Sequence, residues 1–204
     1  MAFACLMYHS LADGRFPDAQ YPKYATTRDQ FAAHLPGLIE AGFQIGTFAD
    51  SLQSGEGKSP LPDNLCVLTF ADGHTSSLEL AELMSIANVR GTFFLTINYC
   101  RDREDFLKPP AMRELAAAGF DFGTHGVTHR ALSGMSDVEM RAELCDSKRW
   151  LEDALGRPVR TMSLPAGQGS ESVRAAAFEL GCRLVGTSVE KMNTAFPPPR
   201  SIAL

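Results

Sequence analysis

Short apolar runs alternate along the chain with longer segments in which apolar residues recur at helical spacing. Apolar runs bounded by turn residues favour buried strands, whereas apolar positions three and four residues apart favour helices. About seven strands are expected, in segments 3–9, 65–70, 91–99, 120–126, 159–167, 182–188 and 200–204. Helices are expected between them, in segments 26–42, 76–88, 109–119, 136–156 and 170–181.

Several residues mark where these elements begin and end. Thr27 is a suitable N-cap for the first helix, and Gly42 is a suitable stop for it. Pro36 inside that helix predicts a kink or a split, because proline removes one helical hydrogen bond. The segment SGEGKSPLPDN, residues 54–64, is rich in Gly, Pro and Ser and predicts a surface loop.

The alternation of strands and helices predicts an α/β fold. Strands that are apolar along their whole length are buried on both faces, as in a parallel sheet covered by helices. Closed on itself, a sheet of about seven such strands is an incomplete or distorted TIM-like (β/α)7 barrel; left open, it is a doubly wound sheet. The 204 residues, 45% of them hydrophobic, suffice for one core, so we expect a single domain over residues 1–204.

Composition limits the classes of partner. Charged residues make up 21% of the chain, the net charge is −5 and no basic run stands out, so nucleic acid is not an expected partner. The apolar opening MAFACLMYHS is too short to span a membrane and lacks the charged start of a signal peptide. We therefore expect a soluble protein without a membrane span. The oligomeric state cannot be derived from the sequence.

The number and spacing of the cysteines indicate the cellular compartment. Five cysteines, an odd number and without C-x-x-C spacing, argue against a disulfide framework and favour a reducing compartment. We therefore expect a cytoplasmic protein. Secretion or a periplasmic location remains an alternative if a signal segment precedes this sequence.

Polar residues at three predicted strand ends form a candidate site. Asp72 follows strand LCVLTF, His125 lies in FDFGTHG with His129 four residues later, and His9 ends FACLMYH. One carboxylate and two imidazoles can hold a metal and leave a position open for water, as in catalytic metal sites. Such ligands suit zinc, although cobalt, nickel or iron would accept them too.

Each of these residues also fits a purely structural role. Asp72-Gly73 is a pair that favours tight turns, and two histidines four residues apart often face solvent. His9, next to Tyr8, fits a half-buried histidine with one hydrogen bond, and His34 is expected on a helix surface. Only their joint placement at strand ends favours a metal site.

The segments VLTFADG, GTFFL and THGVTH resemble, in order and spacing, the motifs of the polysaccharide deacetylase family, also called carbohydrate esterase family 4 or the NodB-homology domain. The family shows T-F-D-D-G, a T-F-F strand and H-[ST]-x-x-H, so Gly126 stands where Ser or Thr is usual. The opening LMYHS is similar to the branch of poly-N-acetylglucosamine deacetylases, in which the barrel is permuted and the strand with the catalytic histidine opens the domain.

The resemblance implies a role for each residue of the candidate site. Asp72, His125 and His129 would bind a divalent metal, usually zinc. No histidine follows His129, so His9 would be the general acid that protonates the departing amine. The implied reaction is metal-dependent hydrolysis of N-acetyl groups, and the implied partner is an N-acetylated oligo- or polysaccharide.

The resemblance also implies a substrate wall. Pro165, Ala166 and Gly167 of SLPAG match the family's P-Y-G segment, with alanine in place of the aromatic residue. The arginine that precedes this segment in the family has no clear counterpart. Tyr8, beside His9, is a further expected substrate contact.

Ala71 stands where the chemistry calls for a base. A carboxylate must accept a proton when metal-bound water attacks the amide, and in the family this is the first Asp of T-F-D-D-G. Loss of such a base costs on the order of 10²–10⁴ in rate, and His74 is not expected to occupy the same place. The chain should therefore bind metal and substrate but turn over poorly. Engineered inactivation, a natural pseudoenzyme that binds carbohydrate, and an esterase for O-acetyl groups remain alternatives.

Overall fold

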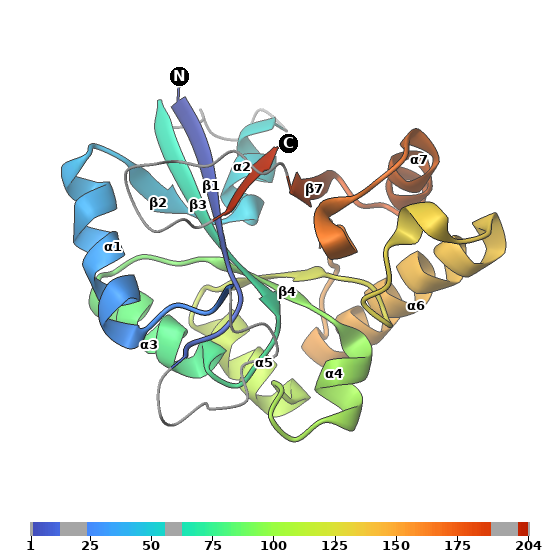
Figure 1. The fold of residues 1–204 in the computed structure, drawn as a ribbon, viewed down its shortest axis with the longest axis horizontal. Helices are drawn as coiled ribbons and strands as arrows, with labels where there is room; N and C mark the ends of the chain where they lie inside the picture. The colour runs from blue at the N-terminus through green and yellow to red at the C-terminus, as the bar shows by residue number, and fades with distance from the viewer. Residues whose placement is uncertain (1, 13–23, 56–62, 189–199, 204) are drawn as a thin grey trace.

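The computed structural model describes residues 2–12, 24–55, 63–188 and 200–203 (Figure 1). The strands are β1 (Ala2–Tyr8), β2 (Gln44–Gly46), β3 (Asn64–Asp72), β4 (Thr92–Leu95), β5 (Asp121–Thr124), β6 (Thr161–Ser163), β7 (Leu184–Ser188) and β8 (Arg200–Ala203). The α-helices are α1 (Arg28–Glu40), α2 (Phe48–Gly55), α3 (Ser77–Ile86), α4 (Ile97–Asp102), α5 (Pro109–Ala117), α6 (Asp137–Leu155) and α7 (Glu171–Glu179). Two short 3₁₀ turns are η2 (Leu132–Gly134) and η3 (Pro165–Gly167).

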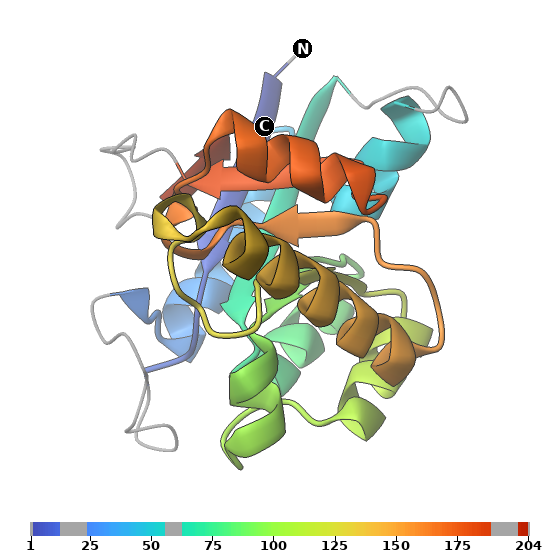
Figure 2. The same ribbon diagram turned by 90° about the vertical axis from the view of Figure 1, so that its right-hand side faces the viewer.

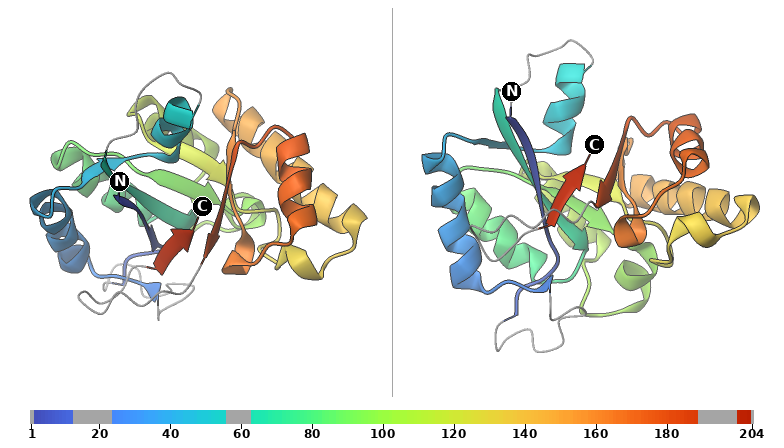
Figure 3. Two further views of the ribbon diagram at one scale, coloured as in Figure 1. Left: turned by 90° about the horizontal axis from the view of Figure 1, so that it is seen from above. Right: turned by 45° about the horizontal axis from the view of Figure 1, so that its top comes forward.

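The strands form one curled sheet with the helices outside it. Their order is β1-β8-β7-β6-β5-β4-β3-β2, and β1 also pairs with β3, so seven of the eight described strands close into a ring. Seen from above, the strands curve around one another inside the layer of helices (Figure 3). On one side, α6 and α7 cover the wall together (Figure 2). The predicted distorted TIM-like (β/α) barrel is confirmed.

The registers bring the predicted site segments to one end of the barrel. β1 and β3 run parallel, with Tyr8 opposite Phe70. β3 and β4 are also parallel, with Ala71 opposite Phe94. Because parallel strands end on the same side of a sheet, the residues after β1, β3 and β5 gather there. The expectation of a wholly parallel sheet is wrong at β8, which pairs antiparallel with both β1 and β7.

Side chains of β3 alternate between the two faces of the wall, as the two-residue period of a strand requires. Leu68 and Phe70 belong to the large apolar cluster that β3 shares with the outer helices. Leu65, Val67 and Ala71 belong to a smaller cluster with Phe94 on the other face. Ala71 is therefore a buried residue on the inner face of the barrel.

Several boundaries differ from the prediction. The apolar segment 91–99 is a strand only to Leu95 and then forms α4, and the segment 159–167 ends as a strand at Ser163. β2 and α2 were not predicted, and α2 includes the first two residues of the expected loop 54–64. Residues 56–62 of that loop lie outside the described residues.

The predicted start of the first helix is confirmed. The Thr27 side chain accepts from the Gln30 amide while the Gln30 side chain accepts from the Thr27 amide, a capping box that pairs two otherwise orphaned donors. Pro36 lies inside α1, which continues to Glu40. All five cysteines are free, and four of them are buried. In the part of the chain that the structure describes, every helix is too short or too polar to span a bilayer.

Candidate metal centre

The backbone turns sharply where β3 ends. Asp72 has φ +73° and Gly73 has φ +87°, both in the left-handed region, and the Gly73 amide donates to the carbonyl of Ala71 at 3.0 Å. A Cβ at Gly73 would lie 2.6 Å from a methyl carbon of Leu95, so the turn requires glycine. A left-handed conformation at a residue other than glycine costs about 1–3 kcal/mol and is typical of functional sites.

This turn places Asp72 against the two predicted histidines. Its Oδ1 atom lies 3.2 Å from Nε2 of His129 and 4.0 Å from Nε2 of His125. One ligand atom from each of the three residues lies within 4.8 Å of the other two. Asp72 and His125 are buried and His129 is half-buried. The structure thus brings together the three residues that the sequence singled out as metal ligands.

The hydrogen bonds of Asp72 test whether these residues fit a metal. Oδ1 accepts from the hydroxyl of Thr96 at 3.1 Å, whereas Oδ2 is buried and makes no hydrogen bond. Leaving a buried carboxylate oxygen unpaired is costly, and buried charges are normally paired or coordinate a metal. The unpaired Oδ2 and the two imidazole nitrogens fit the carboxylate–histidine ligand set of a divalent metal.

His125 is held in the form that a metal requires. Its Nδ1 lies 2.8 Å from the carbonyl oxygen of Ser163, which can only accept, so Nδ1 carries the proton and Nε2 presents its lone pair toward Asp72. Burial lowers the pKa of His125 to about 4, although the nearby Asp72 carboxylate opposes this shift. The imidazole is therefore neutral at neutral pH and needs to lose no proton to bind a metal.

His9 and Ala71 lie at the same end of the barrel. His9 follows the last residue of β1, and extending the β1–β3 register by one position places it opposite Ala71. The His9 ring stacks on Tyr24, with centroids 5.2 Å apart. A positive charge on His9 lowers the pKa of His125, so the two imidazoles lie within electrostatic reach. Ala71 itself is 2% exposed and carries no group that could accept a proton.

Tyr8 does not lie with these residues. It is buried on the outer face of β1, against Phe31 and Phe70, and its hydroxyl lies 3.2 Å from Nδ1 of His34. Neighbouring residues of a strand point to opposite faces, so a tyrosine next to an inward-facing histidine points outward. The expected substrate contact of Tyr8 is therefore corrected to a core role. His34, expected on the surface, is half-buried.

The SLPAG segment lies beside the three ligands. Its Ser163 carbonyl binds His125, and Pro165 is buried next to Gly126, where an added Cβ would lie 3.4 Å from the proline ring. Ala166 is exposed and has φ +57°, and Gly167 completes the turn with φ +67°. The segment thus borders the site, with its alanine turned to solvent.

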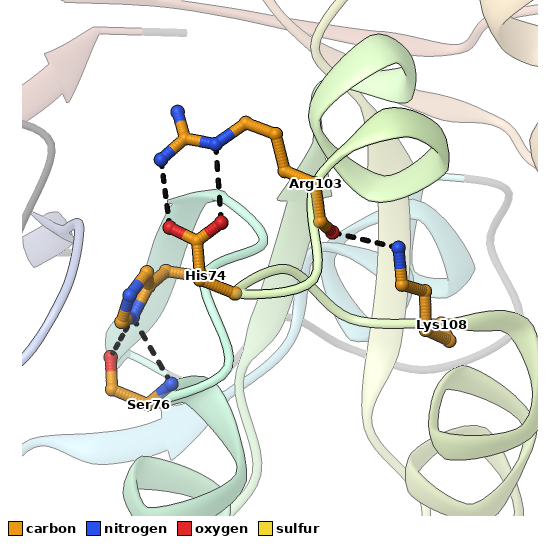
Figure 4. A network of polar contacts seen from close by, with 5 residues as sticks. His74, Ser76, Arg103 and Lys108 are labelled. Carbon is orange, nitrogen blue, oxygen red and sulfur yellow. Dashed lines mark hydrogen bonds and ion pairs between the residues drawn. The ribbon is translucent and has the colours of Figure 1, made fainter. Parts of the chain in front are cut away.

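His74 takes part in a separate polar network (Figure 4). Its Nδ1 contacts the hydroxyl of Ser76 at 2.9 Å and accepts from the Ser76 amide at 3.2 Å, and burial lowers its pKa. Beside it, Arg103 pairs with Asp105 at 2.7 Å, and Lys108 donates to the Arg103 carbonyl. These contacts secure the loop after Asp72, and they occupy the His74 side chain away from Ala71, in line with the expectation that His74 does not take the place of a base there.

Two residues that contact the ligands were not predicted. Ser163 acts through its backbone carbonyl, which any residue type supplies, so no sequence signal could identify it. Thr96 donates from the start of α4, a segment that was interpreted as a strand. The T-F-F-L-T run does carry this threonine, but its contact with Asp72 depends on the β3–β4 register.

Comparison with known proteins places this geometry in a family. The model for polysaccharide deacetylases matches residues 58–185. YxkH of Bacillus subtilis is 28% identical over 88% of this chain, and this chain spans 62% of that protein's length. The structure of IcaB from Ammonifex degensii has the same fold, with a TM-score of 0.78, 22% identity and coverage of 91% of this chain and 83% of that one.

Two further solved structures are of a family pseudoenzyme and of its mutant. A family pseudoenzyme from Bacillus anthracis matches 58% of this chain and 41% of its own length with a TM-score of 0.52 and 21% identity, and a mutant of it with restored enzymatic activity matches equally well. The family model covers more than half of the sequence, and the fold and the IcaB-like architecture agree with it. This chain belongs to the polysaccharide deacetylase family.

Proposed function

We propose that this protein is a metal-binding carbohydrate deacetylase scaffold whose general base has been replaced by Ala71, so that it binds an N-acetylated glycan and hydrolyses it slowly. The observation that carries the proposal is the cluster of Asp72, His125 and His129, in which one oxygen of the buried Asp72 carboxylate is unpaired. Asp72 directly follows Ala71. A structural role for these three residues would not explain why that oxygen is left without a partner.

The three ligands fit zinc best among divalent metals, because two imidazoles and one carboxylate leave positions open for water and substrate. A metal bound there would polarise the acetamide carbonyl and lower the pKa of its water. The protein holds Asp72 through Thr96 and fixes the tautomer of His125 through Ser163. Both contacts orient the ligands before any metal arrives.

Hydrolysis of the amide needs two proton transfers, one from the attacking water near position 71 and one to the departing amine from His9. The methyl group of Ala71 cannot accept the proton of the attacking water, so that proton must pass to solvent, which is slow. His9 lies at the same barrel end and would donate a proton to the departing sugar amine. Stacking on the ring of Tyr24 would hold the imidazole in place for this role.

The role of His9 is tested by removing it from a chain that carries Ala71→Asp. We expect His9→Ala in that background to lower acetate release by roughly 10²-fold or more, because general acids contribute about that much, while bound metal stays unchanged. The measurement is acetate release together with metal content. Loss of metal would instead make His9 a ligand and refute the permuted arrangement.

The second candidate is a non-catalytic carbohydrate-binding protein that uses the same site, and Ala71 is the observation that favours it. Acetate release by the Ala71→Asp variant separates the two, because only a dormant deacetylase gains activity from one carboxylate. Parallel assays on N-acetylated and O-acetylated oligosaccharides separate an amidase from an esterase.

A further inference from the structure

The loop that carries His129 is the least regular part of the metal centre. Residues 126–129 form no helix, and both Gly126, at φ +79°, and His129, at φ +62°, adopt left-handed conformations. Nothing in the local backbone therefore favours this path, and tertiary contacts must hold it. On one side, the amides of Ile97 and Asn98 at the start of α4 donate to the carbonyls of Gly126 and Val127, at 3.1 and 3.0 Å.

A single buried carboxylate holds the other side of the loop. Oε2 of Glu143, on α6, accepts from the amide of Val127 at 2.7 Å and from the amide of Thr128 at 3.0 Å. Oε1 of Glu143 accepts from the hydroxyl of Thr128 at 2.6 Å. Glu143 is 8% exposed, so these three charge-assisted bonds replace its hydration.

The absence of a side chain at Gly126 leaves room for the Glu143 carboxylate. A Cβ at position 126 would lie 3.1 Å from Oε2 of Glu143, closer than the two groups could comfortably approach. The glycine that departs from the family's usual Ser or Thr therefore lets the Glu143 carboxylate lie directly beneath the loop. The two residues are matched to each other, and both act on the path between His125 and His129.

We propose that Glu143 is a positioning residue for His129: it sets the conformation of the 126–129 loop and thereby holds His129 where it can bind the same metal as Asp72 and His125. This inference rests on the proposed metal site. The three hydrogen bonds of Glu143 go to Val127 and Thr128 and to no ligand side chain, so Glu143 acts through the two residues before His129. Outer contacts of this kind typically change metal affinity about 10–100-fold.

The test is zinc and cobalt affinity of the 204-residue chain, measured by competition with a chromophoric chelator, together with the visible absorption of the cobalt form. We expect Glu143→Ala to weaken binding about 10–100-fold and to change the cobalt spectrum, because His129 is no longer held. Glu143→Gln should recover most of the affinity. Its oxygen can accept from both amides and its NH₂ can donate to the Thr128 hydroxyl.

The matched control lies on the same helix. Glu152 accepts from the Val159 amide at 2.9 Å and pairs with Lys148, so it also secures a loop, but one remote from the ligands. Glu152→Ala should lower thermal stability and leave both affinity and spectrum unchanged. If Glu143→Ala does not fold, Thr128→Val removes one of the three bonds and should give a smaller loss of affinity in the same direction.

The outcomes separate this inference from the proposed function. If the unchanged chain and Glu143→Ala bind zinc equally well, Glu143 has no positioning role, although the metal centre is still supported. If Glu143→Ala does not fold, unchanged zinc affinity in Thr128→Val leads to the same conclusion. If Glu143→Gln is as weak as Glu143→Ala, the charge matters instead of the hydrogen bonds, and the positioning role is again refuted. If the unchanged chain binds neither metal, the metal centre and the role of Glu143 both fail.

Discussion

Replacing Ala71 by aspartate should raise acetate release from N-acetylglucosamine oligomers by about 10²–10⁴-fold in the presence of zinc, because a positioned base contributes about that much. Position 71 is next to Asp72 and on the inner face of β3, where a carboxylate would meet the barrel mouth. Its burial among apolar residues would raise the pKa of the new carboxyl, which suits a base that works near neutral pH. The measurement is initial rate at equal metal content.

The matched control for this variant is Ala71→Asn. Asparagine has nearly the same size and polarity as aspartic acid but cannot accept the proton, so this variant should remain as slow as the unchanged chain. Equal activity of the two variants would mean that position 71 does not hold the base. If Ala71→Asp binds metal but releases no acetate from N-acetylated or O-acetylated substrates, the result would favour the carbohydrate-binding protein.

Replacing His125 by alanine should abolish stoichiometric metal binding. The change leaves one carboxylate and one imidazole, and catalytic zinc sites use three protein ligands. The contact of its Nδ1 with the Ser163 carbonyl also fixes the tautomer of His125. Metal per chain, measured by elemental analysis after dialysis, should fall from one to near zero.

The control is His34→Ala, which removes a half-buried histidine that contacts the Tyr8 hydroxyl on the outer face of the barrel. It should retain one metal per chain, although it loses some stability. Full metal occupancy in His125→Ala would contradict the ligand assignment, and loss of metal in both variants would point to general unfolding.

Much of the fold could be predicted because local chemistry and tertiary structure agree. Thr27 is the N-cap of α1, as predicted, and β3 includes the apolar run that begins at residue 65. The prediction failed where distant contacts decide the structure. The apolar run after Leu95 becomes α4, whose first amides Ile97 and Asn98 bind the carbonyls of the 126–129 loop. The hydrophobic pattern of residues 91–99 holds no information about the 126–129 loop, so it could not predict this helix.

The candidate site shows the same division. Asp72, His125 and His129 could be identified because metal ligands must be particular side chains at strand ends. Ser163 and Glu143 could not, since the first acts through a backbone carbonyl and the second through backbone amides 15 and 16 residues away. The error at Tyr8 has a simpler cause, because the alternation along β1 already directs it away from the face of His9.

The most direct test of this account is acetate release by the Ala71→Asp variant before zinc is stripped with a chelator, after stripping, and after zinc is restored. We expect activity before stripping, loss of activity after stripping and recovery once zinc is restored, because hydrolysis needs both the base at position 71 and a metal held by Asp72, His125 and His129. Activity that persists without metal would contradict the account, as would the absence of activity while zinc occupies the site.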